Sequence, residues 1–149
     1  MSEQRRELFE RIYGILNEHD PQRVDEVFTE DVVFEDDAWP TIMHGRDEVR
    51  SFLTAIWRAA PDFNFELIEG PYASPDGRHA AARIKVSGTF TGSYDPPGLA
   101  PTNGVVSTEF GAFYEFEGGQ IKRERVILNM YDMGVQHGAL PERGTLGER

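Results

Sequence analysis

The stretch Ile121–Gly138, which reads IKRERVILNMYDMGVQHG, decides the fold of this chain. It follows Gly118-Gly119, and adjacent glycines favour a two-residue hairpin turn because glycine tolerates positive φ angles. Residues 121–131 are therefore predicted to form the returning strand of a hairpin, closed by a short helical turn. Alternation gives this strand two faces. One face carries Ile121, Arg123, Arg125, Ile127 and Asn129, and the other carries Lys122, Glu124, Val126, Leu128 and Met130. Alternation alone does not say which face is turned inward.

The segments before this hairpin place helices first and strands afterwards. Apolar residues recur at helical spacing over Leu8–Leu16 and over Val49–Trp57, and Asp20-Pro21 is typical of the start of a short helix between them. After Pro61 the apolar period changes from 3.6 to 2. The alternating segments are 63–67, 80–90 and 106–116. This order predicts an α+β fold in which three N-terminal helices pack on a curved, mostly antiparallel sheet with an apolar interior.

Length and charge limit the classes of function. The 149 residues suit a single domain, expected over residues 1–140, and residues 141–149 are expected to form a mobile tail because they have little to bury. A net charge of −11 disfavours nucleic-acid and anionic-membrane partners. The chain has no cysteine, which excludes disulfides and thiol catalysis. Because it also shows no signal peptide or apolar run long enough to cross a bilayer, we expect a cytoplasmic protein.

Several short motifs occur in an order that a known family shares. They are FTEDVVF at 28–34, GRDEVRSF at 45–52, APDF at 60–63, GTFTG at 88–92, PTNG at 101–104 and QHG at 136–138. Through them the chain resembles the SnoaL-like polyketide cyclases of the NTF2-like superfamily, from about Phe9 to Gly138. The resemblance implies a cone-shaped fold with a pocket for a hydrophobic small molecule, no cofactor, and a homodimer.

The chain departs from this family at two positions. Relatives carry a general acid/base Asp on the last strand, and counting back from QHG places Asn129 there; an amide does not exchange protons near neutral pH. Ala112 replaces a second, polar pocket residue. The epoxide-hydrolase relatives need an Asp–Arg–Asp set, in which Arg83 fits but Lys85 and Asn129 occupy the Asp positions. Epoxide hydrolysis therefore ranks low among the reactions that the resemblance implies.

The resemblance also implies that the Asn129 face of the last strand is turned into the pocket. Asn129 would then donate a hydrogen bond to a carbonyl or enolate oxygen, and Arg125 would polarise an enolate. Each has an alternative. The alternative for Asn129 is that it satisfies backbone groups where the strand ends, and the alternative for Arg125 is a position at a wet rim, paired with Glu109 or Glu124.

Two titratable residues are candidates for the proton carrier. Asp36 shares a strand face with Phe34, and a carboxylate beside an apolar cavity has a raised pKa and can act as a base. The alternative is a solvated acidic turn over residues 35–37. His44, before the third helix, would act from the mouth of the pocket, unless it is an ordinary surface histidine. The four histidines show no metal-site spacing, so no metal is expected.

The leading function is a cofactor-independent cyclase that folds a polyketide-like substrate for intramolecular ring closure. The expected substrate-binding residues are Trp39, Trp57, Ile84, Phe110, Ala112 and Tyr131. Two alternatives stay open: a non-catalytic ligand-binding protein or accessory subunit, and an isomerase or dehydratase of ketosteroid-isomerase type. A binding protein needs no buried titratable group, an isomerase needs a carboxylate with a raised pKa, and a cyclase needs a long, bent cavity.

Overall fold

The computed structural model describes residues 2–95 and 98–141. The helices are α1 (Ser2–Leu16), the 3-10 turn η1 (Pro21–Arg23), α2 (Val24–Val27), α3 (Arg46–Ala59) and α4 (Met130–His137). The strands are β1 (Phe28–Asp36), β2 (Met43–His44), β3 (Asn64–Ala73), β4 (His79–Thr89), β5 (Val105–Glu117) and β6 (Gln120–Leu128). Apart from Pro141, the tail expected at residues 141–149 lies outside the described residues.

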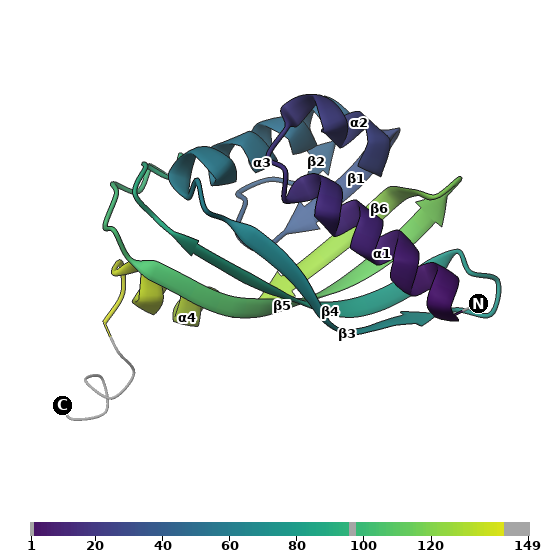
Figure 1. The fold of residues 1–149 in the computed structure, drawn as a ribbon. Helices are drawn as coiled ribbons and strands as arrows, with labels where there is room; N and C mark the ends of the chain where they lie inside the picture. The colour runs from purple at the N-terminus through teal and green to yellow at the C-terminus, as the bar shows by residue number, and fades with distance from the viewer. Residues whose placement is uncertain (1, 96–97, 142–149) are drawn as a thin grey trace.

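The strands form one curved sheet in the order β2-β1-β6-β5-β4-β3. Neighbouring strands are antiparallel except β1 and β6, which are parallel. Helices α1, α2 and α3 lie together on one face of the sheet, and α4 lies beside β5 (Figure 1). The prediction of an α+β fold with three N-terminal helices on a mostly antiparallel sheet is confirmed, with α4 as an addition at the C-terminal end. None of the described helices is long and apolar enough to span a bilayer.

The helix starts follow from local sequence. Asp20 caps η1 by accepting a hydrogen bond from the Gln22 backbone N–H at 3.0 Å, and Pro21 occupies the first position of the turn. Gly45 precedes α3 with a φ of 87°, a conformation that favours glycine, and its N–H donates to the Val32 carbonyl at 2.7 Å. The hydrogen bond to Val32 ties the start of α3 to the middle of β1.

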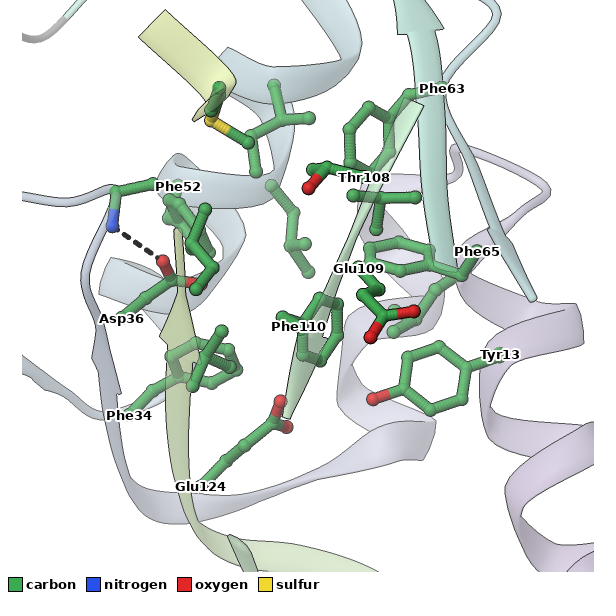
Figure 2. Close-up of a pocket in the computed structure, with 18 of the residues that line it drawn as sticks. Tyr13, Phe34, Asp36, Phe52, Phe63, Phe65, Thr108, Glu109, Phe110 and Glu124 are labelled. Carbon is green, nitrogen blue, oxygen red and sulfur yellow. Dashed lines mark hydrogen bonds between the residues drawn. The ribbon is translucent and has the colours of Figure 1, made fainter. Parts of the chain in front are cut away.

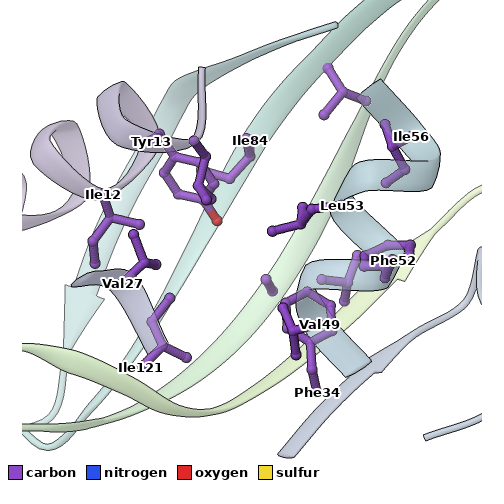
Figure 3. Close-up of a cluster of buried hydrophobic side chains, with 14 of the residues drawn as sticks. Ile12, Tyr13, Val27, Phe34, Val49, Phe52, Leu53, Ile56, Ile84 and Ile121 are labelled. Atoms are coloured by element: carbon purple, nitrogen blue, oxygen red, sulfur yellow. The ribbon is translucent and has the colours of Figure 1, made fainter. Parts of the chain in front are cut away.

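The core lies between the helices and the concave face of the sheet (Figure 3). The five α3 residues predicted to face the core are all buried, namely Val49, Phe52, Leu53, Ile56 and Trp57. They pack with side chains of α1, β1, β4 and β6 such as Ile12, Phe34, Ile84 and Ile121. Burial of each such side chain contributes about 1.5–3 kcal/mol relative to exposure. This packing holds α1 and α3 against the sheet.

The last strand differs from its prediction in length and in the direction of its faces. It ends at Leu128 rather than Tyr131, because Asn129 begins a helix. Its pairing with β5 shifts between Phe116↔Ile121 and Glu115↔Arg123, so that β6 holds one extra residue, a β-bulge. The bulge reverses the alternation. Beyond it the inward residues are Glu124, Val126 and Leu128, and the outward residues are Arg123, Arg125 and Ile127.

Candidate active site

An apolar cavity lies between α1, α3 and the concave face of the sheet (Figure 2). Seven phenylalanines line it, namely Phe28, Phe34, Phe52, Phe63, Phe65, Phe90 and Phe110. Its volume is about 60 Å³. A second, outer pocket of about 270 Å³ shares Ala38, Phe90, Tyr94 and Met133 with this inner cavity. The two spaces therefore adjoin.

Asp36 brings a carboxyl group into the inner cavity from the end of β1. Its neighbours Glu35 and Asp37 do not line this cavity and pair with Arg125, at 3.5 and 2.9 Å. The Ala38 backbone N–H donates to Asp36 Oδ1 at 2.7 Å. Burial raises the pKa of Asp36 to about 7, against the lowering effect of the Ala38 N–H. Both protonation states are thus accessible near neutral pH.

Glu124 is the second buried acid of the cavity; Glu109 also lines the cavity, but it is exposed and pairs with Arg83 at 2.7 Å. Its side chain comes from β6 and is buried, with 4% of its surface exposed. The hydrogen bonds found among the described residues include none to its carboxyl group. Burial, followed by the charge of Asp36, raises the pKa of Glu124 well above its usual range. Glu124 therefore keeps its proton to higher pH than an exposed glutamate does, and the O–H of the protonated form can donate a hydrogen bond.

A buried pair of phenols adjoins the acids. The hydroxyl groups of Tyr13, on α1, and Tyr114, on β5, lie 2.6 Å apart. Burial is the main cause that raises the pKa of both tyrosines, so both stay protonated. Tyr13 lines the cavity, and its hydroxyl and the Glu124 carboxyl are turned toward the same space (Figure 2). The cavity thus holds one carboxyl that can accept a proton and two groups that can donate hydrogen bonds.

Of the four residues expected to carry the chemistry, Asp36 alone lines the inner cavity. Asn129 is the N-cap of α4: its Oδ1 accepts a hydrogen bond from the Asp132 backbone N–H at 3.0 Å. The expected placement of Asn129 in the pocket is wrong, because its side chain satisfies the helix start.

Arg125 and His44 also lie away from the inner cavity. The bulge in β6 turns Arg125 to the outer face of the sheet, where it pairs with Glu35 and Asp37 rather than with Glu109 or Glu124. His44 is exposed on the short strand β2, and its backbone N–H donates to the Glu48 carboxylate. Neither residue lines either of the two cavities.

The expected substrate-binding residues are divided between pocket, core and surface. Phe110 lines the inner cavity and Trp39 the outer pocket. Three are buried core residues that line neither space: Ile84, Ala112 and Trp57, whose ring stacks on His19 at 5.2 Å. Tyr131 donates a hydrogen bond to the Pro141 carbonyl at 2.8 Å and also lines neither space.

Sequence reasoning missed Glu124 and Tyr13 as site residues. Glu124 shares its strand face with Val126 and Leu128, and an acid within an apolar face is a signal of a buried functional group. This signal was not used, because the resemblance pointed to the opposite face, that of Asn129, as the inward one, and the bulge reverses the alternation within the strand. Tyr13 was assigned to the apolar stripe of the first helix. Among residues 2–95 and 98–141, no cluster of three His, Asp or Glu side chains could hold a metal ion.

Comparison with known proteins identifies a family and several solved structures that are similar to this chain. Residues 9–124 match a family described as the SnoaL-like domain. No curated protein matches the sequence. Solved structures do match: a candidate SnoaL-like polyketide cyclase from Jannaschia sp. CCS1 has a TM-score of 0.77 and 14% identity, covering 94% of this chain and 95% of that one.

Two further solved structures are similar. TsrD from Streptomyces laurentii has a TM-score of 0.76 and 20% identity, covering 91% of this chain and 95% of that one. The other is SalBIII, described as an epoxide hydrolase/cyclase-like enzyme with a role in pyran ring formation in the polyether salinomycin. It has a TM-score of 0.71 and 23% identity, covering 87% of this chain and 94% of that one. At these identities the similarity to the solved structures establishes the fold alone.

Proposed function

Because this chain belongs to the SnoaL-like domain family, we propose that it is a cofactor-independent enzyme that closes a ring in a hydrophobic, polyketide-like substrate. The observation that carries the proposal is the pair of buried acids in the inner cavity, Asp36 and Glu124. Asp36 has a pKa of about 7, and Glu124 has a pKa well above its usual range. Environments that push two carboxyl groups into different protonation states are a general basis for acid–base catalysis.

In the proposed reaction the Asp36 carboxylate removes a proton from a carbon next to a ketone. The electron pair of that C–H bond moves to the ketone oxygen, and the enolate oxygen accepts a hydrogen bond from the protonated Glu124 carboxyl. The enolate carbon attacks a second carbonyl group of the same molecule, which forms the ring bond and leaves an alkoxide. The proton held by Asp36 then neutralises the alkoxide, so the product is an isomer of the substrate.

The solved relatives support ring closure as the reaction class. SalBIII is described as acting in pyran ring formation, and the Jannaschia protein is described as a polyketide cyclase candidate. The adjoining inner cavity and outer pocket supply the extended space that a chain-like substrate requires.

A second candidate, an isomerase of ketosteroid-isomerase type, is favoured by the same Asp36. If the enolate has no second carbonyl within reach, Asp36 can return the proton to a different carbon of the conjugated system and so move a double bond. The two reactions share the first step and differ in the fate of the enolate. A purely ligand-binding role gives no use to two buried carboxyl groups, whose burial disfavours folding when they ionise.

Incubation with 2,6-heptanedione in heavy water tests these functions together. NMR reports both the exchange of the α-protons and the formation of 3-hydroxy-3-methylcyclohexanone. A cyclase accelerates both, and Asp36→Asn loses the acceleration by about 10²–10⁴-fold. Exchange without ring closure, together with conversion of cyclohex-3-enone to cyclohex-2-enone, would identify the isomerase. If the wild type accelerates neither exchange nor conversion above the rate in buffer, the catalytic proposal fails.

The protein is proposed to work as a homodimer that pairs through the outer face of the sheet. Val105, Phe113 and Ile127 expose apolar side chains on this face, to 67%, 59% and 48%. Their burial against a second copy would remove apolar surface from water. Sedimentation of the wild type and of Phe113→Glu tests this: a dimer that the substitution converts to monomer supports the proposal, and a wild-type monomer contradicts it.

A further inference from the structure

We propose that Tyr94 is a positioning residue for the reaction, because its hydroxyl group holds the turn that orients the Asp36 carboxylate. The proposal rests on the proposed function for the role of Asp36 as the base, whereas the hold on Asp36 can be measured without any substrate. Tyr94 belongs to the loop between β4 and β5, far from Asp36 in the sequence. It lines both the inner cavity and the outer pocket.

The base is held by a turn that directly follows β1. The Ala38 backbone N–H donates to Asp36 Oδ1 at 2.7 Å, and the Trp39 backbone N–H donates to the Asp36 carbonyl at 3.0 Å. Ala38 lies beyond the pairing of β1 with β6, which ends at Asp36. Among the described residues Asp36 Oδ2 has no hydrogen bond, which leaves this oxygen to receive a proton from a substrate. The orientation of the carboxyl group therefore depends on the position of Ala38.

Tyr94 fixes Ala38 by a second hydrogen bond. Its hydroxyl donates to the Ala38 carbonyl at 3.2 Å. Tyr94 is itself well held: it is buried, its ring lies edge-on to Phe90 with centroids 6.2 Å apart, and its backbone N–H and carbonyl bond to Leu99 at 2.9 and 2.7 Å. Ala38 is thus tied to the base through its N–H and to Tyr94 through its carbonyl. A catalytic group needs such support from surrounding residues to stay in one orientation.

The other anchor of the turn lies on β6. Asp37 pairs with Arg125 at 2.9 Å, which ties the turn to that strand but does not involve the backbone of Ala38. Without the Tyr94 hydroxyl this anchor remains, and the hydrogen bonds of Ala38 among the described residues are reduced to the one with Asp36. The turn should then stay formed, while Ala38 moves more freely.

The proton equilibrium of Asp36 reports how well the turn holds it. Burial raises the pKa of Asp36, and the Ala38 N–H is the strongest influence that lowers it, ahead of the charges of Asp37, which raises the pKa, and Arg125, which lowers it. Helix α3 contributes only apolar side chains to the cavity. The other titratable side chains that line the cavity are Tyr13 on α1, Tyr94 itself, Glu109 on β5 and Glu124 on β6. Because Tyr94→Phe alters none of the neighbouring charges, a changed pKa of Asp36 in this variant reports the turn.

Tyr94→Phe removes the hydroxyl group and keeps the ring, so it tests the proposal directly. The Ala38 N–H should bind the carboxylate less well. Because this hydrogen bond favours the charged form, the pKa of Asp36 should rise by about 0.5–1 unit, which ¹³C NMR of its carboxyl carbon measures without a substrate. Hydrogen exchange of the Ala38 amide should accelerate about three- to tenfold. With 2,6-heptanedione the variant should react about three- to tenfold more slowly than the wild type at pH 6, and the two rates should converge at pH 9, where Asp36 is ionised in both.

Tyr72→Phe is the matched control. The Tyr72 hydroxyl donates to a carboxylate directly, that of Glu69, at 2.8 Å. Tyr72 is exposed on β3 and lines neither the inner cavity nor the outer pocket. This variant loses a tyrosine hydroxyl away from the turn, so it should leave the pKa of Asp36 and the exchange rate of the Ala38 amide unchanged.

An unchanged pKa of Asp36 in Tyr94→Phe would overturn the proposal. A raised pKa with unchanged exchange at Ala38 would also overturn it, because the hydroxyl would then act on Asp36 directly rather than through the turn. A rate loss that is equal at pH 6 and pH 9 would indicate a merely structural effect and have the same consequence. In the wild type the Ala38 amide should be protected from exchange; an unprotected amide would overturn the proposal even if the variant does not fold. If the wild type catalyses no reaction, the proposed function fails, and a raised pKa in Tyr94→Phe would still establish the hold of Tyr94 on Asp36.

Discussion

Asp36 and Glu124 project from the same face of two parallel neighbouring strands. Asp36 lies opposite Val126, and Glu124 lies opposite Phe34, so the two acids are offset by two residues along the β1–β6 pair. Both carboxyl groups enter the inner cavity, and burial raises the pKa of each above its ordinary value. The two acids thus reach one cavity from one face of the sheet.

The activity should depend on pH through Asp36. The base form of Asp36 is its carboxylate, and its pKa is about 7. The rate constant kcat/KM is therefore expected to rise with pH, to reach half its maximum near pH 7, and to level off above pH 8. Rates of the 2,6-heptanedione reaction between pH 5 and 9 measure this. A profile that is already flat at pH 5 would assign the base to a carboxylate with an ordinary pKa.

The stability should fall as pH rises, also because of Asp36. In the unfolded chain Asp36 loses its proton near pH 3.8, whereas in the folded protein it does so near pH 7. Between these values the folded state binds more protons, so the free energy of unfolding decreases with pH. Asp36→Asn keeps the acceptor for the Ala38 N–H and cannot ionise. It should be more stable than the wild type by roughly 4 kcal/mol at pH 8, at about 1.4 kcal/mol for each pKa unit.

Urea unfolding of both proteins at pH 4 and pH 8 measures this difference. At pH 4 Asp36 is protonated in the folded protein, so the two proteins should unfold at nearly the same urea concentration. An advantage of Asp36→Asn that is equal at both pH values would show that the substitution acts through packing rather than through ionisation.

Glu124 is expected to act as a hydrogen-bond donor to the developing oxyanion. Glu124→Leu removes the donor and keeps an apolar side chain of similar size, so kcat should fall by about 10²–10³-fold. Glu124→Gln is the matched control, because its amide N–H still donates, and it should lose about tenfold or less. Equal rates for the two variants would remove Glu124 from the mechanism.

Asn129 is expected to contribute to stability and not to the reaction. Asn129→Ala removes the hydrogen bond to the Asp132 N–H and should lower the free energy of unfolding by about 1 kcal/mol with kcat unchanged. Asn129→Asp caps a helix equally well and should keep both stability and rate. A loss of more than tenfold in kcat for a folded Asn129→Ala would restore a catalytic role to this position.

Most of the fold could be predicted from the sequence, because the spacing of apolar residues and the residue preferences of turns and helix starts depend on the local sequence. The apolar stripe of α3, the Asp20-Pro21 helix start and the Gly118-Gly119 hairpin all behave as their patterns predict. The inward direction of Asp36 also follows from simple alternation with Phe34.

The rest of the site could not be predicted, for a physical reason at β6. A single extra residue between Ile121 and Arg123 exchanges the two faces of the strand, and no pattern in the sequence marks it. The resemblance implied that Arg125 lies inside, with a position at the rim as the alternative, and Glu124 was not among the candidate catalytic residues. The position of Asn129 was misjudged because the motif that follows it begins a helix, whose backbone needs a cap. Trp57 and Ile84 were expected in the pocket but are buried in the core. Whether a buried side chain borders a cavity depends on how the helices pack on the sheet, which the sequence pattern does not show.

Titration of the Asp36 and Glu124 carboxyl carbons by ¹³C NMR tests the central claim most directly, since it requires no substrate. The claim is that one buried acid exchanges its proton near neutral pH while the other stays protonated. The carboxyl signal of Asp36 is expected to titrate near pH 7, and that of Glu124 to stay in its protonated position at pH values where the exposed glutamates have ionised. Two carboxyl groups that both titrate below pH 5 would contradict the claim.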